Sequence, residues 1–439
     1  MRPLYKSGFF LLVFFCCCSV LPQAQPVKQY YFTHYNSTAG LISTEVKSVV
    51  QDDAGYIWIG TVDGLQRFDG NRFMTFKYQP GQLGGIPSNH ITQLLLDHQK
   101  RLWILTNEGY TGVFDTKTLR YNPAKVMPDT PSSFGATIKK LILDESGHIF
   151  MLFGGIEVLT YSEEQNEFSS KYNFFKTPPG TGVADFAHQP GTSNYWICVR
   201  EGVAIYNKKT RVLSYPGNNR EKIPAIDAFT GITIPANIFF DLKGRCWLQS
   251  WVSGLPRAYR IRLADKKPVV EEYELLPLVN TYFETSAFFE QKDGTIWMGG
   301  LNIFARFIEE ENRFQLVYNG YRNERSISYE KVVSLFEDRE KNIWVATDNN
   351  GLYRFNPAEQ YFTNTAHTDR VTQKTGKGSV LSFATTRWGT ILAGTWSNGV
   401  YQYDQQMNLL PLRINGIPEQ HGPSVWSMCV SADSNTIWM

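Results

Sequence analysis

Short apolar runs with a tryptophan at their centre recur along the chain. Ile57, Trp58 and Ile59 form the first, directly after the turn residues Asp52 to Gly55. Aromatic and β-branched residues bounded by turn residues are typical of short strands. The central position falls at residues 58, 103, 150, 196, 247, 297, 344, 392 and 438, with Phe150 and Leu392 in place of tryptophan. Such regular spacing, 45 to 51 residues, indicates a repeat architecture.

Each repeat has room for four short strands. In the first repeat these are expected at residues 45–51, 56–61, 64–69 and 72–78, and in the seventh at 331–337, 342–347, 351–355 and 360–364. Four antiparallel strands in a period of this length match one blade of a β-propeller. Because no long stretch carries the 3.6-residue apolar period, very little helix is expected. The predicted fold is all-β, a propeller of four-stranded antiparallel blades.

Residues 30–35 precede the first complete repeat and resemble an isolated fourth strand. A propeller must join its first and last blades, since an unpaired strand edge promotes aggregation. We therefore expect seven blades in residues 25–360, with this strand on the outside of the blade at 331–355. Residues 361–439 would then hold the first blades of a second, truncated propeller. A single eight-bladed ring is the alternative, but it leaves the ninth copy unexplained. The end of the chain inside a strand, at Met439, suggests a fragment or a truncated gene.

Residues 1–24 resemble a secretory signal peptide. Arg2 and Lys6 form its positive end, and residues 9–21 form an apolar run that is short for a membrane span. An uncleaved anchor is the alternative, and no other run is long enough to span a membrane. Cleavage would also remove three of the six cysteines. We expect the remaining ones, Cys198, Cys246 and Cys429, to be buried free thiols.

Charge and histidine spacing exclude several functions. The chain has 43 Lys and Arg and 41 Asp and Glu residues, and loss of the signal peptide leaves 41 of each sign. A neutral chain argues against a nucleic-acid surface, which needs a basic stripe. The seven histidines are scattered without the spacing of metal ligands. No metal and no cofactor are therefore expected.

Candidate ligand-binding residues are those that break the repeat. The central tryptophans recur in nearly every repeat and are expected to form the core. The turns between second and third strands share one face of a propeller with the links between blades, and there the copies diverge. Aromatic rings and amide or carboxyl groups suit a sugar, although packing against a neighbouring blade or propeller is the alternative. The candidates are Asp63, Asn107, Glu108, Trp251, Asp348, Asn349, Trp396 and Asn398.

Several motifs recur in register. Gly40-Leu41-Ile42-Ser43, Ile57 to Thr61, Gly64-Leu65 and Arg67 to Gly70 show the pattern in the first repeat. It closely resembles the two-component regulator propeller repeat. Residues 53–58 also fit the Asp-box turn of sialidase propellers, which is a structural feature and does not indicate a sialidase.

The resemblance implies a periplasmic sensor of a hybrid two-component histidine kinase of the Bacteroidetes type. In that family two propellers occur in tandem and are followed by a β-sandwich module, a membrane helix and a kinase core. The implied function is binding of a polysaccharide-derived oligosaccharide, relayed across the inner membrane to a homodimeric kinase. Its catalytic domains would lie beyond residue 439, so no enzyme activity is expected here. A glycan hydrolase or lyase and a protein-binding scaffold are the alternatives.

Overall fold

The computed structural model describes residues 30–129, 138–153, 157–229, 235–252, 255–263, 268–279, 281–320, 325–358, 379–396, 398–405, 407, 409–412, 424–431 and 436–439. These residues form two compact units, one within Gln29–Phe362 and one within Thr363–Met439. The predicted signal peptide and the predicted strand at 360–364 lie outside the described residues.

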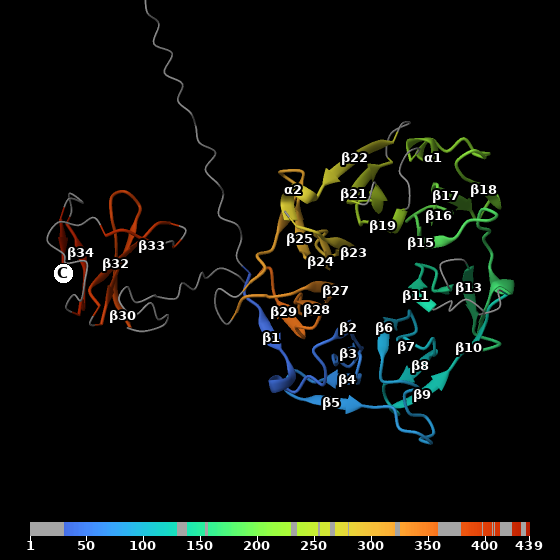
Figure 1. Cartoon of the computed structure of the whole chain (residues 1–439), viewed down its shortest axis with the longest axis horizontal. Coiled ribbons are helices and arrows are strands. Elements are labelled where there is room, and N and C mark those ends of the chain that lie inside the picture. Colours follow the sequence, from blue (N-terminus) through green and yellow to red (C-terminus); the bar gives the residue numbers. More distant parts are fainter. Residues whose placement is uncertain are drawn as a thin grey trace, which may run out of the picture. The chain divides into compact units, whose positions relative to one another are not determined.

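The first unit is a ring of seven antiparallel β-sheets, in which the first strand of each blade lies nearest the centre (Figure 1). The predicted all-β propeller of four-stranded blades is therefore confirmed. Blade 1 comprises β2 (Val46–Gln51), β3 (Ile57–Thr61), β4 (Gly64–Phe68) and β5 (Phe73–Phe76); blade 2 comprises β6 (Ile91–Leu96), β7 (Leu102–Thr106), β8 (Thr111–Asp115) and β9 (Arg120–Pro123); blade 3 comprises β11 (Ile138–Leu143), β12 (Ile149–Phe153), β13 (Glu157–Ser162) and β14 (Glu167–Ser169), with β10 (Lys125–Met127) parallel to β14.

The remaining blades repeat this order. Blade 4 comprises β15 (Val183–His188), β16 (Asn194–Val199), β17 (Gly202–Asn207) and β18 (Val212–Ser214); blade 5 comprises β19 (Pro235–Phe240), β20 (Cys246–Val252), β21 (Leu255–Arg262) and β22 (Val269–Glu274); blade 6 comprises β23 (Glu284–Glu290), β24 (Ile296–Leu301), β25 (Ile303–Ile308) and β26 (Arg313–Leu316); blade 7 comprises β27 (Lys331–Glu337), β28 (Ile343–Asp348) and β29 (Leu352–Phe355). Blades 6 and 7 are joined by one residue pair, Leu301 with Lys331.

Helices are short and lie between strands. They are α1 (Pro224–Ala228), α2 (Leu276–Val279) and the 3-10 turns η1 (Ser37–Ala39) and η2 (Ser170–Tyr172). No helix in the described part of the chain has the length and apolar character needed to cross a membrane.

The outer strand of blade 7 comes from the start of the chain. β1 (Thr33–Tyr35) pairs antiparallel with β29, with Thr33 opposite Arg354. Just before it, the ring of Phe32 packs against that of Phe355, with centroids 4.7 Å apart. The predicted closure is therefore confirmed, and it leaves no unpaired edge at β29.

The central position of each second strand is buried in all seven blades. The fully or almost fully buried side chains are Trp58, Trp103, Phe150, Trp196, Trp247, Trp297 and Trp344. In blade 1 the indole Nε1–H of Trp58 donates to Asp52 Oδ2 over 2.7 Å, and the backbone N–H of Tyr56 donates to Asp52 Oδ1. The carboxylate that joins the turn to the core is therefore that of Asp52, and not that of Asp53, with which the predicted Asp-box begins.

The same acceptor recurs six residues before the tryptophan in other blades. Asp97, Asp241 and Asp338 accept from the indoles of their own blades over 2.8 to 2.9 Å. In blade 6 the amide oxygen of Gln291 replaces the carboxylate, at 2.7 Å. A buried indole N–H needs a partner, so this contact links the turn to burial of the ring.

The second unit contains an antiparallel sheet of β30 (Val380–Thr385), β31 (Ile391–Thr395), β32 (Val400–Tyr403) and β33 (Leu409–Leu410), and a pair of β34 (Cys429–Val430) and β35 (Ile437–Trp438). Leu392 is buried like the central residues of the ring. Trp438, the ninth central residue, is 68% exposed, so the expectation of burial is wrong at this position.

The cysteines differ in their burial. Cys198 and Cys246 are buried free thiols, as predicted, whereas Cys429 is exposed, which corrects the prediction for that residue. Cys198 and Cys246 belong to one apolar cluster between blades 4 and 5. Opposite faces of neighbouring sheets meet in a propeller, and this brings together residues that are 48 positions apart. Burial raises the pKa of both thiols well above the ordinary value.

Candidate ligand-binding rim

One end of the ring carries both the turns between second and third strands and the links that enter each inner strand. This follows from the alternating strand direction within each blade. We call this end the rim face. In blades 1, 2 and 7 its turns lie between β3 and β4, between β7 and β8, and between β28 and β29.

Four predicted residues are exposed on this face. Asp63, Asn107, Glu108 and Asn349 belong to the turns of blades 1, 2 and 7. Partial burial raises the pKa of the Glu108 carboxyl, but hydrogen bonds from Ser88, its own backbone N–H and Thr106 outweigh it, and the net direction is downward. Asn349 has a left-handed backbone (φ 73°), and its Nδ2 lies 3.4 Å from Glu330 Oε2.

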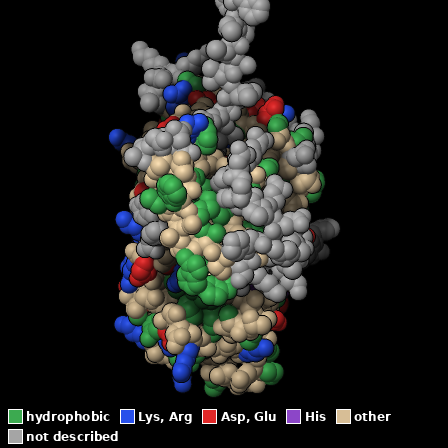
Figure 2. Space-filling model, turned by 90° about the vertical axis from the view of Figure 1, so that its left-hand side faces the viewer, with side chains coloured by type: hydrophobic (Ala, Val, Ile, Leu, Met, Phe, Trp, Pro, Cys, Tyr) green, Lys and Arg blue, Asp and Glu red, His purple; other side chains and the backbone are tan. Residues whose placement is uncertain are grey.

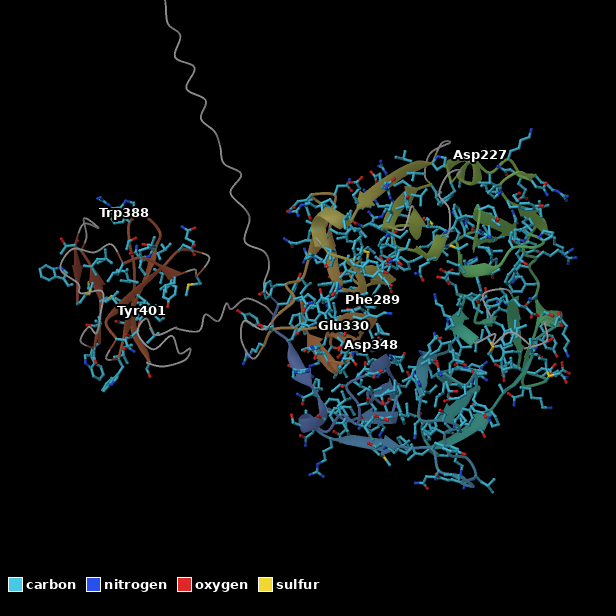
Figure 3. All side chains as sticks on the ribbon, in the orientation of Figure 1. Asp227, Phe289, Glu330, Asp348, Trp388 and Tyr401 are labelled. Carbon is cyan, nitrogen blue, oxygen red and sulfur yellow. The ribbon has the colours of Figure 1, made fainter. Side chains whose placement is uncertain are left out.

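Asp348 is engaged within the ring. Its Oδ1 lies 2.6 Å from Lys47 Nζ on the inner strand of blade 1, and both side chains are partly buried. Figure 3 places Asp348 beside Glu330, which approaches Asn349 as described above. This ion pair spans the seam where the ring closes, so the alternative of packing between blades holds for Asp348.

Trp251, Trp396 and Asn398 lie outside the rim turns of blades 1, 2 and 7. Trp251 lies near the end of β20, and its side chain is outside the described residues. Trp396 and Asn398 lie in the turn between β31 and β32 of the second unit. Six of the eight candidates therefore belong to the first unit, and Trp396 and Asn398 belong to the second.

A β-bulge explains which residue Asp348 meets. Each inner strand has a register shift near its beginning, where one residue is skipped in the pairing with the second strand. A bulge re-aims the skipped side chain. In blade 1 this residue is Lys47, which reaches Asp348, the last residue of β28 in the preceding blade.

In the second unit, tryptophans occupy the positions that correspond to Asp348 and Lys47. Trp396 follows β31, and Trp426 follows Val425, whose backbone N–H donates to Thr395. Their ring centroids lie 4.9 Å apart at an interplanar angle of 77°. Trp396 is 49% exposed and Trp426 is 65% exposed. Sequence reasoning found Trp396 and missed Trp426, because the contact between their rings becomes visible only in the folded unit.

Other exposed aromatic side chains occur in this unit. Trp388 lies in the turn before β31, at the opposite end of the blade from Trp396, and the guanidinium of Arg387 lies 4.3 Å from its ring centroid. Phe383 and Trp438 are also exposed. Hydrophobic side chains stand among polar ones on the side of the molecule shown in Figure 2.

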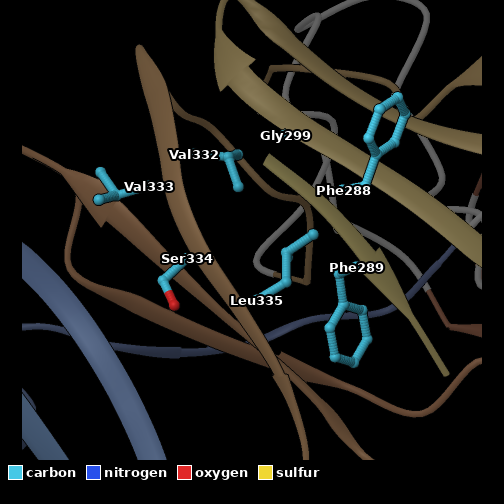
Figure 4. A pocket seen from close by; sticks show the side chains of 7 residues that line it. All are labelled: Phe288, Phe289, Gly299, Val332, Val333, Ser334 and Leu335. Atoms are coloured by element: carbon cyan, nitrogen blue, oxygen red, sulfur yellow. The ribbon is translucent and has the colours of Figure 1, made fainter. Parts of the chain in front are cut away.

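A small cavity lies between blades 6 and 7. It has a volume of about 110 Å³ and is lined by Phe288, Phe289, Gly299, Val332, Val333, Ser334 and Leu335 (Figure 4). Pockets for drug-sized ligands measure about 300 to 1,000 Å³, so an oligosaccharide does not fit inside. Among the described residues, no group of three His, Cys, Asp or Glu is placed to hold a metal ion.

A family model and one relative each match part of this chain. The family model described as "Two component regulator propeller" matches residues 40–63, 85–108 and 326–349. Histidine kinase P4 of Formosa agariphila is 32% identical over 73 residues, which are 17% of this chain and 5% of that protein.

Solved structures share the fold. The extracellular domain of one hybrid two-component system of B. thetaiotaomicron is 18% identical, with a TM-score of 0.67, over 93% of this chain and 52% of that one. A second such domain is 15% identical, with a TM-score of 0.51, over 92% and 50%. The chain thus spans about half the length of these domains. Blades 1, 2 and 7 therefore carry two-component regulator propeller repeats.

Proposed function

We propose that this chain is the sensor portion of a hybrid two-component histidine kinase, lies in the periplasm, and binds an oligosaccharide released from a polysaccharide. The family match carries the proposal. Its three matched segments end at Asp63, Glu108 and Asn349, which all stand in rim turns. The repeat therefore covers the link and the two inner strands, and ends where the blades differ from one another.

Two sets of side chains, one in each unit, support a sugar ligand. The exposed indoles of Trp396 and Trp426 offer flat apolar faces to the C–H groups of a pyranose ring. Side chains of Asn107, Glu108 and Asn349 offer hydrogen-bond donors and acceptors on the first unit. Relay across the membrane requires the ligand to favour one arrangement of a homodimeric kinase over another. The kinase step itself would belong to domains outside this chain.

Calorimetry on the purified chain tests the proposal. The probes are neutral linear tetrasaccharides of glucose, xylose, mannose and galactose, together with a galacturonate oligomer. We expect heat with at least one probe. Trp396→Ala and Trp426→Ala should each lower the affinity by about tenfold or more, because tryptophan is a typical hot-spot residue.

Trp388→Ala is the matched control. It removes an exposed indole from the opposite end of the blade that carries Trp396 and should leave the affinity unchanged. A chain that releases no heat with any sugar would favour a protein-binding scaffold, and new reducing ends after incubation with polysaccharide would favour a glycan-cleaving enzyme.

A further inference from the structure

Polar side chains join the inner strands of the first blades. In blade 1, Ser48 Oγ accepts from the backbone N–H of Leu94 over 3.0 Å and donates to Leu94 O over 3.3 Å. In blade 2, the amide of Gln93 accepts from the N–H of Leu141 over 2.7 Å and donates to Leu141 O over 2.9 Å. In each pair, one side chain satisfies both backbone groups of one residue on the next inner strand.

Leu335 presents the same two backbone groups in blade 7. It lies two places after the residue skipped at the bulge, as Leu94 does in blade 2. The N–H of Asp338 donates to Asn342 O, so the alternation of an antiparallel ladder leaves Leu335 and Val345 without mutual backbone hydrogen bonds. The N–H and C=O of Leu335 therefore point away from β28 and toward blade 6.

Blade 6 has no polar side chain at the linking position. The residue of β23 that corresponds to Ser48 and Gln93 is residue 287, an alanine, whose side chain contains no hydrogen-bonding atom. Among the described residues, neither the N–H nor the C=O of Leu335 has a hydrogen-bond partner. A backbone group in this state lowers stability unless water or a ligand supplies the partner.

The cavity between blades 6 and 7 lies at this position. Leu335 lines it from blade 7, and Phe289 and Gly299 line it from blade 6 (Figure 4). Phe289, Val333 and Leu335 are partly exposed, so the cavity is open to solvent. A cavity of about 150 Å³ holds a benzene molecule, so the volume of about 110 Å³ has room for about five non-hydrogen atoms.

The walls and the two backbone groups define what fits. The apolar side chains of Phe289, Val332 and Leu335 favour a short hydrocarbon group. The free N–H and C=O need an acceptor and a donor side by side, and Gln93 shows that a primary amide supplies both at ordinary hydrogen-bond lengths. A hydroxyl meets the requirement less well, since the contacts of Ser48 are longer.

Other common groups do not satisfy both partners. A carboxylate only accepts, and an ammonium only donates. A secondary amide is trans, so its N–H and C=O point in opposite directions and do not reach both groups of one residue.

We infer that the cavity between blades 6 and 7 binds a small primary amide, whose oxygen accepts from Leu335 N–H and whose NH₂ group donates to Leu335 O. The amide takes the place that the side chain of Gln93 fills between blades 2 and 3, and its hydrocarbon group lies against Phe289 and Val332. The inference goes beyond the proposed function and does not depend on a sugar ligand.

Saturation-transfer NMR on the purified chain with three isomeric amides tests the inference. Propionamide presents its donor and acceptor side by side, N-methylacetamide presents them on opposite sides, and N,N-dimethylformamide has no donor. We expect propionamide to be saturated at millimolar concentration. The other two should bind about tenfold more weakly, because each leaves a backbone group of Leu335 unpaired.

Two variants supply the missing group from the chain itself. Ala287→Gln should abolish saturation of propionamide and raise the unfolding temperature by about 2 to 4 °C, because Leu335 gains two hydrogen bonds. Ala287→Ser, with a hydroxyl like that of Ser48, should weaken the saturation. Ser48→Ala is the matched control. It removes the corresponding link between blades 1 and 2, so it should lower the unfolding temperature and leave propionamide binding unchanged.

Three results would overturn the inference. They are equal saturation of the three isomers, saturation of propionamide that persists in both Ala287 variants, and absence of saturation with the wild-type chain, which would assign water to the cavity. The sugar titrations are independent of all three, so the proposed function stands or fails separately.

Discussion

Substitution of Asp52 by alanine removes the acceptor that ties the first turn to the core. Asp52 is almost fully buried, and its two oxygens accept from Trp58 Nε1 and from the backbone N–H of Tyr56. Leaving the buried indole unpaired costs about 1 to 3 kcal/mol, and loss of the second bond adds about 1 kcal/mol. The expected destabilisation is therefore about 2 to 4 kcal/mol.

Thermal unfolding followed by tryptophan fluorescence measures this effect. At about 2 °C per kcal/mol for a domain of this size, Asp52→Ala should lower Tm by about 4 to 8 °C. Asp52→Asn should lower it less, because an amide oxygen already serves as the acceptor at Gln291 in blade 6. Both variants keep the backbone of the turn, so the comparison isolates the acceptor.

Asp53→Ala is the control. Asp53 is exposed and pairs with Arg339 over 3.1 Å at the surface, where an ion pair contributes about 1 kcal/mol or less. Its Tm should therefore stay within about 2 °C of the wild type. The reasoning is refuted if Asp52→Ala melts with the wild type, or if Asp53→Ala is the less stable of the two.

Three further predictions concern closure, thiols and pH. Phe32→Ala removes a buried ring from the closing seam and should cost about 3 to 5 kcal/mol, and a Tm within about 2 °C of the wild type would contradict closure through β1. In a chain starting at residue 25, a thiol reagent should titrate Cys429 alone in the native state and three cysteines in denaturant; rapid labelling of a buried thiol in the native state would contradict the packing between blades 4 and 5. Hydrogen bonds from Arg245 hold the pKa of Glu309 at about 2, against an ordinary 4.5, so the stability from this pair is complete above about pH 4.5 and is lost as pH falls towards 2. The Tm difference between wild type and Glu309→Gln should shrink over that range, and a constant difference would contradict the assignment.

Local patterns in the sequence were sufficient for the blades. The apolar runs around Trp58 and Trp344 predicted second strands that the structure places at β3 and β28. The isolated segment at 30–35 predicted closure, because a ring without it would leave an edge. These features depend on neighbours within a few residues, or on the requirement that every strand be paired.

The candidate site was predicted only in part. The rule that ligand-binding residues break the repeat found Asp63, Asn107 and Glu108 on the rim face and Trp396 in the second unit, all of which are exposed. The same rule included Asp348, which the structure pairs with Lys47. A solvent-facing turn and a contact between blades look alike in a sequence, because the partner lies about 300 residues away.

The spacing of apolar runs by itself determined an all-β propeller of four-stranded blades and its closing strand, because both features depend on strand period and turn chemistry. Only the tertiary structure decided which residues meet between blades: Trp426 with Trp396, and Gln93 with Leu141. The physical reason is that these contacts depend on how the strands pair and how the blades pack, and in the ring the bulge of each inner strand also shifts the register by one residue.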